Sequence, residues 1–98
     1  MISIITVGMN HRNYLEALYR SLYGEGRPDG EMETVYVDNC STDGSVEWLQ
    51  EVYPHVKVIV NTEPLGFGEN NNKGVMASRG EYIGIVNPDI VLKEGSIK

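Results

Sequence analysis

The distribution of apolar residues divides the chain into short and long segments that alternate. Four short runs are rich in β-branched residues, and the segments between them carry apolar residues at helical spacing. The short runs predict strands and the spaced segments predict amphipathic helices. This alternation favours right-handed crossovers, and so a three-layer α/β/α fold with a mostly parallel sheet in the strand order 3-2-1-4. The predicted strands are residues 2–7, 34–37, 56–60 and 82–86.

Polar residues indicate where the predicted helices begin. Asn10 is the predicted N-cap of the first helix, and Thr42 or Asp43 that of the second. The third helix opens at Gly66 and carries three asparagines at residues 70–72, although asparagine is a poor helix former. These asparagines either cap the helix and saturate backbone groups or belong to a functional site.

Small and polar residues also follow each predicted strand. In a parallel sheet the carboxyl ends of the strands share one edge, and ligands bind in the crevice at that edge. We therefore expect the polar clusters to meet there and to form a binding site. The clusters are residues 8–10, 38–41, 61–63 and 87–89.

Length and charge limit the classes of function. The 98 residues suffice for one small domain, and a formal net charge of -6 argues against a nucleic-acid surface, which needs clustered Lys and Arg. A single nucleotide remains a possible ligand. The sequence has no apolar run long enough to span a bilayer and starts directly with a strand, so we expect a cytoplasmic protein. Cys40 is the single cysteine, which fits a reducing compartment, and we interpret it as a small structural residue.

Three residues near the first two strand ends have the chemistry to bind a nucleoside. The Asp38 carboxylate can accept a hydrogen bond from a base imide or a ribose hydroxyl, and Asn39 offers both a donor and an acceptor. Gly8 permits a close approach of the backbone to a ligand.

Phosphate and metal chemistry is available at the other two clusters. Gly66 and Gly68 open the third helix, whose amides and dipole suit an anion. Asp89 supplies a hard carboxylate and Asn87 a neutral oxygen ligand, which together favour Mg2+ or Mn2+.

Four segments carry a more specific pattern. In the first of these segments, Gly8 and Met9 stand at the two positions where the usual motif has Thr and Tyr. The segments are residues 3–10, which resemble an opening strand of the type V-S-I-I-x-V-T-Y-N; residues 37–45, which match V-D-N-x-S-x-D-G-S; residues 66–74, which are similar to the glycine-asparagine part of N-x-G-F-A-x-A-N-N-x-G; and residues 87–89, an N-P-D form of D-x-D.

In this order the segments resemble the N-terminal half of a family 2 glycosyltransferase, of the inverting type with the GT-A fold, and particularly its rhamnosyltransferase-like branch. The resemblance implies a truncated GT-A fold in which residues 1–98 form the nucleotide-sugar-binding part of a larger domain. It implies that Asp38 and Asn39 contact the base and ribose, that Asp89 binds Mg2+ or Mn2+ on the diphosphate, and that the catalytic base lies beyond residue 98. The predicted nucleotide-binding residues are Val7, Gly8, Met9, Asn10, Asp38, Asn39, Gly66, Phe67, Asn71, Asn72 and Asn87.

The same resemblance implies partners. The donor would be a dTDP- or UDP-linked sugar, with dTDP-rhamnose as the first expectation, and the acceptor a glycan or lipid-linked saccharide of polysaccharide biosynthesis. The full-length protein would work in the cytoplasm, peripheral to the inner face of the membrane. The fourth strand would be an open sheet edge through which the isolated chain could form a homo-oligomer.

Two other parallel α/β folds fit less well. A dinucleotide-binding dehydrogenase needs G-x-G-x-x-G after its first strand, where this chain has Gly8-Met9-Asn10. A phospho-receiver domain needs a carboxylate cluster at that place, which Asn10 does not provide. The alternative that remains is a non-catalytic module that binds a nucleotide or a partner.

Overall fold

The computed structural model describes residues 2–24 and 31–86. Strands and helices alternate in it along the whole described chain, as the sequence predicts. The strands are β1 (Ile2–Gly8), β2 (Met32–Asp38), β3 (Lys57–Val60) and β4 (Tyr82–Ile85), and the helices are α1 (Arg12–Leu22), α2 (Ser45–Val52) and α3 (Phe67–Ala77).

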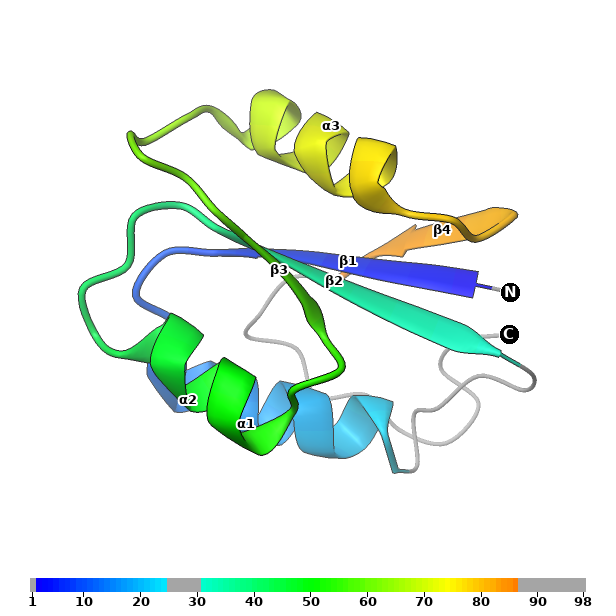
Figure 1. Ribbon diagram of the computed structural model, residues 1–98, viewed down its shortest axis with the longest axis horizontal. Helices are drawn as coiled ribbons and strands as arrows, with labels where there is room; N and C mark the ends of the chain where they lie inside the picture. The colour runs from blue at the N-terminus through cyan, green and yellow to red at the C-terminus, as the bar shows by residue number, and fades with distance from the viewer. Residues whose placement is uncertain (1, 25–30, 87–98) are drawn as a thin grey trace.

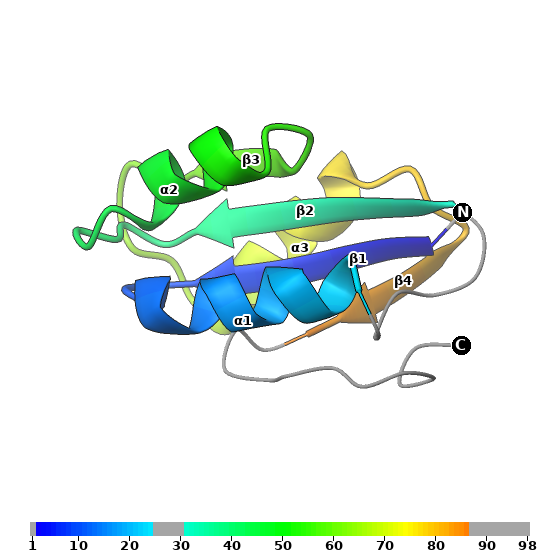
Figure 2. The same ribbon diagram turned by 90° about the horizontal axis from the view of Figure 1, so that it is seen from below.

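The strands form one sheet in the order β3-β2-β1-β4, and every neighbouring pair is parallel. This confirms the predicted strand order. β1 and β2 pair along seven residues each, from Ile2 opposite Met32 to Gly8 opposite Asp38. The strands therefore deliver their carboxyl ends to the same edge of the sheet, on the left in Figures 1 and 2.

Helices cover both faces of the sheet, which confirms the three-layer prediction. α1 and α2 lie side by side on one face and α3 lies on the other (Figures 1 and 2). The main apolar core fills the space between the sheet and the α1/α2 layer, and Trp48 packs partly buried at its border. Its most deeply buried members are Ile4, Leu15, Leu18, Tyr19, Leu22, Tyr36 and Leu49.

The predicted cap of α1 is wrong. The residue before the helix is His11, and its side chain makes no capping hydrogen bond. Asn10 has a left-handed backbone, with φ 59°, and its side-chain oxygen accepts from the backbone N–H of Thr42 at 2.7 Å instead. The side chain thus joins two loops rather than starting the helix.

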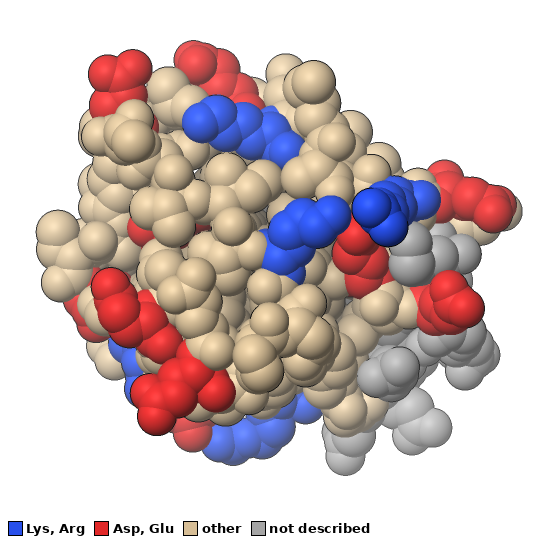
Figure 3. All heavy atoms as spheres, viewed as in Figure 1, with Lys and Arg blue, Asp and Glu red and all other residues tan. Residues whose placement is uncertain are grey.

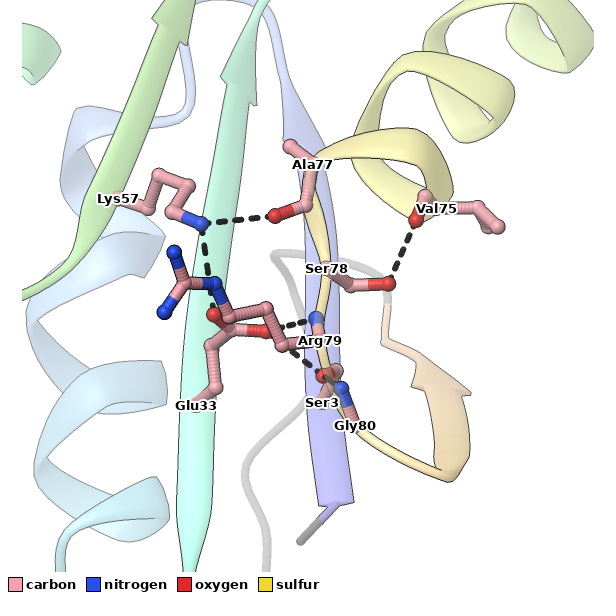
Figure 4. A network of polar contacts seen from close by, with 8 residues as sticks. All are labelled: Ser3, Glu33, Lys57, Val75, Ala77, Ser78, Arg79 and Gly80. Atoms are coloured by element: carbon pink, nitrogen blue, oxygen red, sulfur yellow. Dashed lines mark hydrogen bonds and ion pairs between the residues drawn. The ribbon is translucent and has the colours of Figure 1, made fainter.

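The amino end of the sheet is held by a cluster around Glu33 (Figure 4). Its carboxylate accepts hydrogen bonds from the Ser3 hydroxyl at 2.8 Å, from the Arg79 backbone N–H at 2.7 Å and from the Lys57 ammonium at 3.4 Å. The ammonium also donates to the Ala77 carbonyl, at 2.7 Å. One carboxylate therefore links β1, β2 and β3 to the segment between α3 and β4.

These contacts change the acidity of Glu33. Burial raises its pKa, but the hydrogen bonds from Arg79 and Ser3 and the charge of Lys57 outweigh that effect, so the pKa lies below its usual value. A carboxyl group whose pKa falls on folding stabilises the protein above its unfolded pKa, and this contribution is lost as the pH falls through the folded value.

We expect Glu33→Gln to lower the free energy of unfolding by about 1–3 kcal/mol at pH 7, because several donors lose a charged acceptor. The difference from wild type should shrink as the pH falls below about 4.3, the usual pKa of Glu, toward the lower folded value. Urea unfolding at neutral and acidic pH measures both effects. Glu81→Gln, at an exposed carboxylate just before β4, is the control and should change stability little at either pH.

Candidate functional site

The carboxyl ends of β1, β2 and β3 are joined directly by backbone hydrogen bonds. The Asn39 N–H donates to the Gly8 carbonyl at 2.8 Å, and the Asn61 N–H donates to the Asp38 carbonyl at 2.9 Å. Three of the predicted polar clusters, residues 8–10, 38–41 and 61–63, therefore meet at one edge, as expected. The fourth cluster, residues 87–89, lies outside the described residues.

Asp38 is the charged residue at the centre of this edge. Its side chain is almost completely buried, with 1% of the residue exposed. One carboxylate oxygen accepts from the Tyr36 hydroxyl at 3.2 Å and the other from the Ser41 backbone N–H at 3.0 Å. The carboxylate is thus held by its own strand and by the loop that follows it.

A network of amides fixes the loop between β3 and α3. The Asn39 side chain accepts from the Leu65 N–H at 2.8 Å and donates to the Leu65 carbonyl at 3.2 Å. The Asn61 side-chain amide donates to Asn39 at 3.1 Å and to Asn70 at 2.6 Å, and its oxygen accepts from the Lys73 ammonium at 2.9 Å. Within this network Asn70 is buried and structural, which agrees with the backbone-saturating interpretation of that residue.

The other predicted site residues differ in exposure. Val7 and Asn71 are half-buried, while Met9, Asn10, Gly66 and Asn72 are exposed. Gly66 caps α3 and the backbone of Phe67 begins it. The Asn71 side-chain oxygen is buried without a hydrogen-bond partner among the described residues. Asn87 and the predicted metal ligand Asp89 lie outside those residues.

Asp43 connects the two loops on the α1/α2 side of the edge. Its carboxylate accepts from the backbone N–H of Arg12, the first residue of α1, at 2.8 Å, and from the backbone N–H of Ser45, the first residue of α2, at 3.1 Å. Gly44 occupies the formal N-cap of α2, but Asp43 does the capping, as one of the two predicted alternatives has it. One carboxylate therefore caps both helices.

The environment of Asp43 favours its charged form. Burial raises its pKa, but hydrogen bonds from Ser45 and from the Arg12 backbone outweigh that effect, so the pKa lies below its usual value. The positive ends of two helix dipoles act in the same direction. We therefore expect Asp43 to be ionised over the whole neutral range.

Reasoning from the sequence missed several residues that build this edge. Asn61 lies in a predicted polar cluster and Ser41 in the motif at residues 37–45, so the signal was present without a role attached. Asp43 was predicted only as a possible cap of the second helix, and its contact with the start of α1 was missed. Tyr36 shows only that it lies in a short β-branched run typical of a buried strand, which does not reveal that its hydroxyl reaches Asp38.

The surface charge bears on what this edge could bind. The chain carries a formal net charge of -6, and on the face shown in Figure 3 basic side chains lie in separate groups among acidic ones. An anionic ligand would therefore need a local cation. Residues 2–24 and 31–86 contain no group of three His, Cys, Asp or Glu side chains that could hold a metal ion.

Comparison with known proteins gives a family match and related sequences. The sequence model described as "Glycosyl transferase family 2" matches residues 3–98. A putative teichuronic acid biosynthesis glycosyltransferase of Bacillus subtilis, TuaG, is 29% identical over 101 residues, which cover 100% of this chain and 39% of TuaG. The chain therefore spans well under half the length of this relative.

Solved structures resemble the fold closely. The crystal structure of Staphylococcus aureus TarS 1–349 has a TM-score of 0.83 at 27% identity, covering 94% of this chain and 28% of that one. TarS 1–349 has also been solved with UDP-GlcNAc. The mannosyltransferase PcManGT of Pyrobaculum calidifontis, in complex with GDP-Man and Mn2+, has a TM-score of 0.76 at 25% identity, covering 92% of this chain and 28% of that one.

We expect Asp43→Ala to lower the free energy of unfolding by about 1–2 kcal/mol, because two helices lose a capping acceptor. Asp43→Asn keeps an acceptor oxygen and should cost less. Urea unfolding at pH 7 compares the two variants with Glu51→Ala, a control on the exposed face of α2. Equal losses for Asp43→Ala and Glu51→Ala would contradict the double-cap role.

Proposed function

Since the chain belongs to glycosyl transferase family 2, we propose that it forms the donor-binding part of an enzyme that transfers a sugar from a nucleotide-sugar donor to an acceptor. The observation that carries this proposal is the meeting of Asp38, Asn39 and residues 8–10 at the carboxyl edge of a parallel sheet. Such edges are the usual place for nucleotide ligands in α/β folds. The acceptor we propose is a glycan or lipid-linked saccharide.

We place the base and ribose of the donor at the ends of β1 and β2. The Asp38 carboxylate would accept from the base imide, and the exposed Met9 and Asn10 would flank the nucleoside. Asp38 is almost fully buried, so donor binding would require the loop at residues 39–41 to shift. Asn39 already holds Leu65, and it would act mainly by fixing the neighbouring loop.

We place the phosphates between the start of α3 and the segment after β4. The backbone amides at Gly66 and Phe67 begin α3, where the helix dipole favours an anion. Asn71 and Asn72 follow on the first turns of the same helix. The Asn71 side-chain oxygen is buried and has no hydrogen-bond partner within residues 2–24 and 31–86, so it could accept from a hydroxyl or amide of the ligand.

A divalent cation would complete the phosphate site. Asp89 and Asn87 offer oxygen ligands of the type that Mg2+ and Mn2+ prefer. Bound there, the ion would neutralise charge on the departing diphosphate. The Mn2+ present with GDP-Man in the related mannosyltransferase structure supports a divalent cation as part of the site.

We propose a uridine or thymidine diphosphate sugar as the donor. UDP-GlcNAc bound to TarS supports the uridine form, and dTDP-rhamnose is the alternative suggested by the sequence pattern. The sugar would be transferred with inversion: a general base takes the proton of the acceptor hydroxyl, whose oxygen bonds to the anomeric carbon as the bond from that carbon to the nucleoside diphosphate breaks. Glu63, Glu69 and Glu81 are exposed carboxylates in loops or on a helix face, which we interpret as solvated charges, and Glu94 lies outside the described residues. Following the family resemblance, we place the base beyond residue 98.

The setting of the enzyme is also a proposal. We place it in the cytoplasm, at the inner face of the membrane, where a lipid-linked acceptor would be available. Across the described ranges, no helix has the length and apolar character needed to cross a membrane. The exposed side chains of Tyr82, Ile83 and Ile85 on the edge strand β4 fit our expectation that isolated chains associate through this edge.

UDP should bind to the chain more tightly with Mn2+ than without it. Asp89→Asn should remove most of this metal dependence, because a neutral amide is a weaker ligand for a hard cation. Isothermal titration of UDP with and without Mn2+ measures the effect. Glu63→Gln, at an exposed loop carboxylate, is the matched control and should keep the metal dependence of the wild type.

Asp38→Ala should raise the dissociation constant for UDP about 10- to 100-fold, with or without metal, because a hydrogen bond to a charged group is lost. The same titrations test this, with unfolding curves to confirm that the variant is folded. A dissociation constant equal to that of the wild type would remove Asp38 from the proposed site.

The 98 residues alone should bind the donor without transferring its sugar, because the general base is missing from them in our proposal. Incubation with UDP-GlcNAc or dTDP-rhamnose and candidate acceptor saccharides, followed by mass spectrometry of the products, tests this. Turnover by the chain would show that its own carboxylates suffice. Binding without turnover, even when the chain is extended to the length of its relatives, would favour the non-catalytic module instead.

A further inference from the structure

Tyr36 occupies an unusual place at the end of the sheet. Its side chain is fully buried in β2, and its hydroxyl reaches the Asp38 carboxylate two residues further on. Gly8 lies opposite Asp38 in β1. A Cβ atom on Gly8 would overlap with the Tyr36 hydroxyl. The hydroxyl therefore fills the space in which any side chain at residue 8 would begin.

Gly8 and Tyr36 thus depend on each other sterically. The related motif usually has Thr at the position of Gly8, and a Thr side chain would leave no room for this hydroxyl. The missing side chain at residue 8 is replaced by a hydroxyl that comes from the neighbouring strand. Residue 8 must therefore be glycine because the Tyr36 hydroxyl occupies the space of a side chain. The sequence suggested another reason, namely that glycine lets a ligand approach the backbone.

The two donors to Asp38 differ in how firmly they are held. Ser41 belongs to the loop after β2, whereas Tyr36 lies within the strand and packs in the core beneath α1 and α2. A buried carboxylate is costly unless donors satisfy it. If the loop moves to admit a ligand, Tyr36 is the donor that stays in place.

The Tyr36 hydroxyl also remains a donor at all relevant pH values. Burial, together with the nearby Asp38 carboxylate, raises the pKa of Tyr36 well above its usual value. The phenol therefore stays protonated and can donate its hydrogen bond.

We propose that Tyr36 is a positioning residue for nucleoside recognition, holding the Asp38 carboxylate in the orientation that accepts the imide N–H of a uracil-type base. This role rests on the proposed function. It implies that Tyr36 contributes to the choice of base without touching the ligand itself.

The test compares UDP with CDP, because cytosine has no imide N–H and its ring nitrogen is an acceptor. Tyr36→Phe removes only the hydroxyl and should raise the dissociation constant for UDP about tenfold. The constant for CDP should change less than about twofold, since the lost hydrogen bond does not act on that base. A variant that merely loosens the fold would weaken both nucleotides alike.

Tyr23→Phe is the matched control. It also removes a tyrosine hydroxyl that contacts another side chain, that of Thr34 at 2.6 Å, but it lies beyond the end of α1 and away from the carboxyl edge. It should leave the preference for UDP over CDP unchanged. Urea unfolding of both variants shows whether any loss of binding follows loss of folded protein.

Gly8→Ala provides a second variant if Tyr36→Phe folds poorly. The new methyl group would displace the Tyr36 hydroxyl from Asp38, so the preference for UDP over CDP should fall in the same way. An unchanged dissociation constant for UDP in Tyr36→Phe, or equal losses for UDP and CDP, would overturn the role while leaving the proposed function intact. If the wild-type chain binds neither nucleotide, the proposed function fails and this role fails with it.

Discussion

The parallel pairing of β1 with β2 is the constraint on which the rest of the structure depends. It sets Gly8 opposite Asp38, so that the polar loops that follow the two strands start at the same level. Backbone N–H groups in such loops that find no backbone acceptor need a side chain or water instead. Asn10, Asp38, Asn39 and Asp43 each accept from the backbone of a loop or of a helix start. The polar character of this edge is therefore in large part a structural requirement.

The motif at residues 37–45 has a structural role of its own. Asp38 accepts from the Ser41 N–H, and Asp43 accepts from the first N–H groups of two helices. The side chains that make the chain resemble a nucleotide-binding protein thus also fold the loop that would bind the nucleotide. Binding losses caused by substitutions in this motif carry information about contact only when stability is measured beside them.

The sequence was sufficient for the fold and for part of the edge. Strand order and layers follow from apolar periodicity and crossover handedness, which act through short-range and general rules. The contacts that it could not predict join residues far apart in the chain, such as Glu33 with Arg79 or Asn10 with Thr42. Tyr36 shows a different limit, because its place in a buried strand predicts its burial but not that its hydroxyl turns toward Asp38, two residues away.

The two ends of the sheet are held by different chemistry, and this separates stability from binding. The amino end depends on a charged cluster around Glu33, whereas the carboxyl end depends mainly on amides and backbone donors around Asn61 and Asp38. Sites that share no partners usually contribute additively to stability. A change at Glu33 should therefore alter how much protein is folded without altering the geometry of the carboxyl edge. By contrast, a change at Tyr36 removes a contact of Asp38 directly. The proposed effect of Tyr36 on base selection would therefore not follow from stability alone.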